Sequence, residues 1–172
     1  HGFKVPGPED GGPTEPVAAN SSRLYNFTLD QPAASLWFHP HPHGQTAEQV
    51  YRGLAGVFLL TDDIDDQLRS ANQVPAVEHD IPVVVQDRLF EAEVSGERLL
   101  TYSDDHMSGF GMMGGTTLVN GAELPRLSVE TRQYTFRLYN ASNSRTYDFA
   151  LHDGRTFTIV GSDGGWLPEP VQ

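Results

Sequence analysis

The sequence predicts an all-β protein, and two features of its pattern carry this prediction. Short segments alternate apolar and polar residues, which is the period of a strand with one buried face. Glycine, proline, asparagine and aspartate separate these segments, and such residues are typical of turns. The chain of 172 residues is long enough for one ordinary domain or two small ones.

Four segments are expected to be strands. Two alternate, with Tyr25, Phe27 and Leu29 on one face of the first and Tyr134, Phe136 and Leu138 on one face of the second. The other two are continuous apolar runs, typical of strands buried on both faces. In chain order the four are residues 23–30, 57–60, 81–85 and 133–140.

The remaining elements are a loop, a helix and a hairpin. Residues 2–16 are rich in glycine and proline and predict a loop. A short helix is expected from Thr46, because Gln49 three residues later completes a capping-box pattern, and glycines end it early. Residues 147–161 predict a hairpin, since Asp153-Gly154 suits a tight turn.

Composition excludes several functions. The formal net charge is −12, with no basic patch to offset it, so nucleic acid is not an expected partner. No apolar run approaches the length of about 20 residues that a membrane helix needs. There is no cysteine, which excludes disulfides and thiolate chemistry in this chain. The chain starts without methionine and shows no signal peptide, so a processed or truncated sequence is expected.

The motif H-P-H-P-H, residues 39–43, predicts a metal site. In an extended backbone, residues two apart point to the same side, so His39 and His41 project together. Pro40 and Pro42 favour an extended backbone and remove donors from any ladder, as at a strand edge. Paired imidazoles suit copper, zinc, iron or nickel.

Several metal folds compete for this motif. A metallo-β-lactamase cluster needs an aspartate inside the run, and an amidohydrolase barrel needs about 250 residues. A cupin is the closer alternative, because His41, His43 and Glu48 mimic its ligand spacing. Against the cupin, the expected glycine before the run is missing, and Glu48 lies in the expected helix.

The segment LWFHPHPHGQTAEQVYRGLAGVFLL, residues 36–60, resembles the type 3 copper segment of the multicopper oxidases, in the bacterial branch of laccase-like enzymes, cuprous oxidases and spore-coat laccases. The opening HGFKVPGPEDGGP resembles the family's His-x-His-Gly segment with only its second histidine. VVVQDRLF, LVNG and SDGGWLPEPV resemble segments of the family's second domain. The resemblance runs over nearly the whole chain and implies a cupredoxin-like Greek-key β-sandwich or barrel.

Matched by position, the resemblance implies that His1 and His39 bind one type 3 copper and His41 binds the other. Asp10 matches the acid that assists proton delivery during dioxygen reduction at the trinuclear cluster. The alternative for Asp10 is a turn residue before two glycines. His43 matches no ligand, and Trp37 is expected to pack in the core or shield the cluster.

The chain also departs from the family pattern. A histidine that binds the type 2 copper would precede His1, and a C-terminal cupredoxin-like domain would supply the other cluster ligands and a cysteine-containing blue copper site. The resemblance therefore implies two incomplete domains, residues 1–62 and 81–172, joined by a polar, acidic linker, residues 63–80. By itself, such a chain is expected to be inactive and not to fold autonomously.

The resemblance implies a parent protein that oxidises phenolic or metal-ion donors one electron at a time and reduces dioxygen to water. Its partners would be dioxygen and a small reducing substrate, with copper as cofactor and a periplasmic or extracellular location. Two alternatives stay open, a non-catalytic copper-binding or structural β protein and a cupin-type metalloenzyme. A soft copper(I) site from His106, Met107, Met112 and Met113 is set aside in favour of a loop with incidental methionines.

Overall fold

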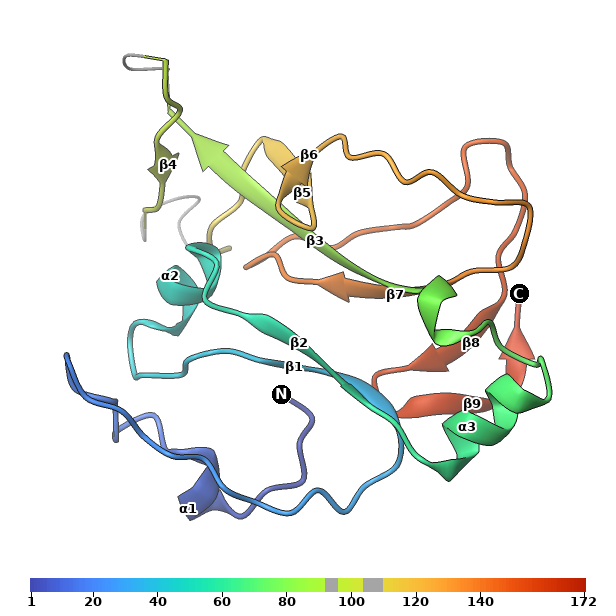
Figure 1. The fold of residues 1–172 in the computed structure, drawn as a ribbon. Helices are drawn as coiled ribbons and strands as arrows, with labels where there is room; N and C mark the ends of the chain where they lie inside the picture. The colour runs from blue at the N-terminus through green and yellow to red at the C-terminus, as the bar shows by residue number, and fades with distance from the viewer. Residues whose placement is uncertain (92–95, 104–109) are drawn as a thin grey trace. The chain divides into compact units, whose positions relative to one another are not determined.

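The computed structural model describes residues 1–91, 96–103 and 110–172. They form two compact units: the first contains His1–Gln67 and Leu151–Gln172, and the second contains Leu68–Ala150 (Figure 1). Most of their regular structure is strand, and the helices of the described residues are short. The all-β prediction is therefore confirmed. No helix in this part of the chain is long and apolar enough to cross a membrane.

The first unit contains two antiparallel strand pairs. β1 pairs with β2, in a register that runs from Ala34 opposite Leu60 to Phe38 opposite Gly56. β8 pairs with β9 across a bulge. Gly165 of β9 approaches β1 so closely that a Cβ added there would lie 2.4 Å from the Ala33 carbonyl oxygen. The elements are α1 (Gly7–Asp10), β1 (Ala34–Phe38), α2 (Thr46–Tyr51), β2 (Gly56–Leu60), β8 (Ile159–Ser162) and β9 (Gly165–Val171).

The second unit is a sheet organised by its longest strand, β3. This strand pairs antiparallel with β4 and β5 and parallel with β7, and β6 extends the sheet beyond β5. β3 and β7 confirm the strands predicted at residues 81–85 and 133–140. The elements are η1 (Val77–His79), β3 (Asp80–Phe90), β4 (Leu100–Thr101), β5 (Thr116–Val119), β6 (Ala122–Glu123) and β7 (Thr135–Asn140). Helix α3 (Asp63–Ser70) runs across the division between the two units.

Two strand predictions were wrong in whole or in part. Residues 23–30 form no strand, because no other segment pairs with them in a ladder. Their alternation is still visible in the exposure, since Phe27 and Leu29 are less exposed than their neighbours. β2 is not buried on both faces, since Phe58 and Leu59 remain 37% and 40% exposed. β7 keeps the predicted alternation, and the face with Phe136 is the more exposed one.

The hairpin at residues 147–161 exists only as its turn. The Gly154 N–H donates to the Leu151 carbonyl at 3.0 Å, and Gly154 has φ of 75°. No ladder joins the two arms, because β8 pairs instead with β9, and the division between the units falls at residue 150.

The helix and the linker were predicted only in part. The helix starts at Thr46 and ends early, but the capping box does not form: Thr46 lies inside the helix, and its hydroxyl donates to the Pro42 carbonyl at 3.2 Å. The expected linker, residues 63–80, contains α3 and η1. Residues 151–172 belong to the first compact unit. This division differs from the two predicted domains, residues 1–62 and 81–172, and the predicted domains stay a prediction.

A buried ion triad joins three elements of the second unit. Arg137 of β7 donates to both carboxylate oxygens of Asp80 at 2.7 and 2.6 Å, and Arg69 of α3 donates at 2.7 Å. The Asp80 side chain is only 4% exposed. Burial raises the pKa of Asp80, but the hydrogen bonds from Arg137 and Arg69 outweigh it and hold the pKa below its usual 3.8. The stability this carboxylate contributes is therefore present above pH 3.8 and is lost as the pH falls through its lowered pKa.

We predict that Asp80→Ala lowers the free energy of unfolding by about 3–5 kcal/mol, because it leaves two buried guanidinium groups without their carboxylate. Urea unfolding of the full-length protein measures this. Glu130→Ala is the control, since it breaks an exposed pair with Arg132 that is worth at most about 1 kcal/mol. Equal losses in the two variants would contradict the assigned role of the triad.

Candidate metal centre

The histidine segment begins where the β1–β2 ladder ends. Phe38, opposite Gly56, forms the last pair, and His39 is the first residue beyond it. The H-P-H-P-H motif is therefore not part of a strand as expected. Its prolines supply no N–H for a ladder. Gly56 lets the aromatic ring of Phe38 lie over the opposite strand, because a Cβ there would come within 2.3 Å of that ring.

The first residues of the chain return to the same place. The backbone nitrogen of His1 lies 2.5 Å from the Trp37 carbonyl oxygen. Gln31 holds the following residues, because its side chain donates to the Gly2 carbonyl at 3.1 Å and accepts the Lys4 N–H at 2.7 Å. The segment is thus attached to β1 and to the residues before it by hydrogen bonds between residues far apart in sequence.

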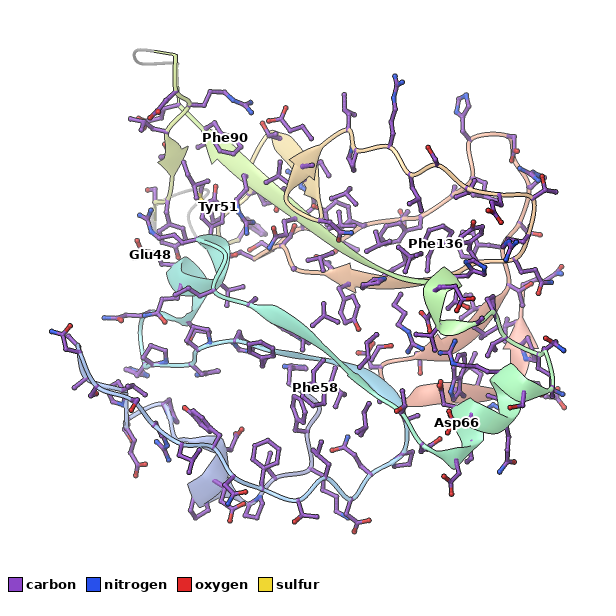
Figure 2. The ribbon with its side chains drawn as sticks, in the orientation of Figure 1. Glu48, Tyr51, Phe58, Asp66, Phe90 and Phe136 are labelled. Carbon is purple, nitrogen blue, oxygen red and sulfur yellow. The ribbon has the colours of Figure 1, made fainter. Side chains whose placement is uncertain are left out.

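A second backbone contact ties the histidine segment to the start of the chain. The His43 N–H donates to the Pro13 carbonyl at 2.9 Å. Helix α2 follows, with Tyr51 fully buried at 1% exposure (Figure 2). The histidines therefore lie on a segment held at both ends, between strand β1 and a packed helix.

Three of the predicted site residues come together in this arrangement. The ring centroids of His1 and His39 lie 6.2 Å apart, and those of His39 and His41 lie 5.8 Å apart. His39 is half-buried, while the other two are exposed. The three imidazoles form a row although 37 other residues separate His1 from His39 in the chain.

A backbone contact of His39 leaves one ring nitrogen available. Its Nδ1 lies 3.0 Å from the Pro40 carbonyl oxygen, and a carbonyl can only accept, so Nδ1 carries the proton. In the neutral ring, the Nε2 lone pair is then the one that can bind a metal. Burial lowers the pKa of His39 below its usual value of 6.5, against the opposing effect of the Pro40 bond, and so favours this neutral form.

Asp10 ends the single-turn helix α1 and is exposed. Gly11 follows it with φ of 86°, which glycine adopts without strain. The negative charge of Asp10 reaches the histidines, because it acts to raise the pKa of His39. Asp10 therefore has the turn position that the sequence suggested, and its role in proton delivery stays a prediction.

The cupin alternative required His41, His43 and Glu48 around one ion. Glu48 instead pairs along α2 with Arg52, whose Nε donates at 2.8 Å (Figure 2). Within the described residues, no group of three or more histidine, aspartate or glutamate side chains could hold a single metal ion. The cupin arrangement is therefore absent from this part of the chain.

Two further expectations concern methionines and Trp37. His106 and Met107 lie outside the described residues, and Met112 is buried at 3% exposure.

Sequence reasoning missed that the indole of Trp37 stacks on both His1 and His39. The signal was available for His39, because Trp37, His39 and His41 stand at every second position.

The chain is similar to known proteins in both sequence and fold. A sequence model of the family described as multicopper oxidase matches residues 1–64. The cell division protein FtsP of Salmonella typhimurium is 39% identical over 170 residues, covering 99% of this chain and 34% of that protein.

Two solved structures are also similar. A multicopper oxidase McoA variant from Aquifex aeolicus has a TM-score of 0.87 at 37% identity, covering 99% of this chain and 37% of that one. A laccase from Pediococcus acidilactici has a TM-score of 0.86 at 40% identity, covering 99% and 36%.

The chain therefore belongs to the multicopper oxidase family and has its cupredoxin-like fold. It spans about a third of the length of the relatives it matches. Family membership implies copper as the cofactor.

We predict that His39 titrates below its usual pKa of 6.5 in the copper-free, full-length protein, because burial disfavours the imidazolium ion. The Hε1 resonance followed by NMR against pH measures the midpoint. Asp10→Asn should lower it further, since the Asp10 charge favours the protonated ring. Glu9→Gln, one residue earlier on α1, should leave it unchanged. A midpoint above 6.5 would contradict the prediction.

Proposed function

We propose that this chain supplies part of the type 3 copper site of a laccase-like multicopper oxidase. The parent protein would oxidise phenolic or metal-ion donors one electron at a time and reduce dioxygen to water. The observation that carries this proposal is the row of His1, His39 and His41, with ring centroids 6.2 and 5.8 Å apart at the end of β1. Membership of the multicopper oxidase family supports the same chemistry.

The residues present fit copper by their chemistry. Imidazole nitrogens are suitable copper ligands, and the Pro40 contact leaves Nε2 of His39 free to bind. Since metal–nitrogen bonds are about 2 Å long, rings about 6 Å apart can approach an ion from different sides.

In this proposal, His1 and His39 bind one copper and His41 binds its partner. Copper held by these residues would supply one-electron redox chemistry toward dioxygen. The protein's own part is to hold the imidazoles at fixed spacing and to supply protons. Asp10 is suited to the second task, because its carboxylate is exposed to water and its charge acts on His39.

The remaining parts of the reaction are assigned to other regions of the parent protein. A blue copper site needs a cysteine thiolate, and this chain has no cysteine. A further cupredoxin-like domain would supply that site and the other cluster ligands. We propose a periplasmic or extracellular location, which the resemblance to the laccase-like branch of the family implies.

A second candidate is a role in cell division without oxidase activity. The similarity to a cell division protein at 39% identity favours it. This chain covers a similar share of that relative and of the oxidase. Copper content and oxygen uptake of the full-length protein separate the two. An oxidase needs both, whereas a structural role needs neither.

We predict that His41→Ala in the full-length protein weakens copper binding by more than about 100-fold, because loss of an outer-shell partner alone already costs 10–100-fold. Metal analysis after dialysis against a chelator measures this. His43→Ala is the matched control, since His43 is held through its backbone N–H, which alanine keeps. Equal copper contents in both variants would remove His41 from the site.

We predict that Asp10→Asn slows oxygen uptake by roughly 100-fold, within the usual range for a lost proton donor, while the copper content stays nearly intact. The amide keeps the shape of the carboxyl group and removes its titratable proton. Oxygen-electrode kinetics and metal analysis on the same sample test this, with Glu9→Gln as control. Copper lost in proportion to activity would make Asp10 structural.

A further inference from the structure

Trp37 occupies a defined place beside the histidine row. It lies in β1 opposite Val57 of β2, one position before the ladder ends. Its side chain is half-buried, whereas the next residue, Phe38, is 55% exposed. Since alternate residues of an extended backbone share a side, Trp37 projects with His39 and Phe38 projects away from it.

The indole contacts two imidazoles that come from different parts of the chain. Its ring centroid lies 4.3 Å from that of His39, with 27° between the planes. It lies 5.3 Å from the ring of His1, with 29° between the planes. Both contacts are stacked. The His1 contact lies within the range of about 4.5–7 Å over which aromatic pairs attract, and the His39 contact lies just below its lower end.

The two imidazoles do not lie on opposite faces of the indole. His1 and His39 are 6.2 Å apart, much less than the two indole distances laid end to end. The indole therefore lies to one side of the pair and contacts both rings.

Trp37 also holds His1 through the backbone. The His1 nitrogen lies 2.5 Å from the Trp37 carbonyl oxygen. Trp37 thus restrains both the main chain and the ring of His1. It also restrains the ring of His39. These restraints act before any metal binds, so they reduce the rotamer entropy that metal binding would otherwise cost.

We propose that Trp37 is a positioning residue that aligns the imidazoles of His1 and His39 for one copper ion. This inference rests on the proposed function, because it assumes that both rings bind that ion. The indole is suited to the task, since its electron-rich face attracts a ring that becomes electron-poor when its nitrogen binds a cation. Apolar cover alone would not require a flat ring at this position.

Three variants of the full-length protein test the proposal. Trp37→Leu keeps an apolar side chain and removes the flat ring, so it should weaken copper binding roughly tenfold through the loss of two ring contacts. Trp37→Phe keeps a flat ring and should recover most of the affinity. Phe38→Leu, on the other side of β1, should bind copper like the unaltered protein. Chelator competition measures the affinities, and thermal unfolding of the copper-free proteins checks the fold.

The outcomes separate this inference from the function beneath it. If His39→Ala binds copper as well as the unaltered protein, the copper assignment fails and the role of Trp37 fails with it. If His39→Ala loses copper while Trp37→Leu retains full affinity, only the role of Trp37 is overturned. Equal losses in Trp37→Phe and Trp37→Leu would also overturn it, because the ring would then not matter. If Trp37→Leu does not fold, the affinity of Trp37→Phe relative to Phe38→Leu decides: a loss greater than tenfold would contradict positioning by a flat ring.

Discussion

The arrangement of the candidate copper site depends on the antiparallel ladder between β1 and β2. This ladder holds Trp37 opposite Val57 and ends at Phe38 opposite Gly56. Prolines follow at every second position, and a residue without an N–H cannot extend a ladder. The histidines His39 and His41 are therefore carried just past the end of a rigid element, and Trp37, the last-but-one residue of β1, packs against the His39 ring.

Backbone hydrogen bonds extend this rigidity to residues that are distant in sequence. The contact of His1 with Trp37 and that of His43 with Pro13 bring the start of the chain alongside the histidine segment. Together these two contacts restrain the irregular backbone that carries the histidines, because they hold it near both of its ends. The row of imidazoles is a consequence of these two attachments and of the stacking on Trp37.

Charged groups have contrasting uses in the two units. In the second unit, Asp87 is buried at 1% exposure and accepts from Arg145 and the Gly114 N–H, both at 2.8 Å. Burial raises the pKa of Asp87, but these bonds together with Ser142 outweigh it and lower the pKa, so the carboxylate stays charged and structural. Asp10 in the first unit is exposed and ends a one-turn helix. Exposure leaves its proton able to exchange with water, which a relay requires.

The sequence by itself determined the all-β class, strands β2, β3 and β7, the start of α2, and the spacing that puts His39 beside His41. These features follow from local alternation and turn chemistry, which depend on neighbours in the chain. Tertiary structure alone decided that residues 23–30 form no strand, that β8 pairs with β9, and that His1 lies against Trp37. The physical reason is that a period of two specifies which side a residue faces, whereas the partner across a ladder or a ring contact is chosen by packing and hydrogen bonds between distant segments.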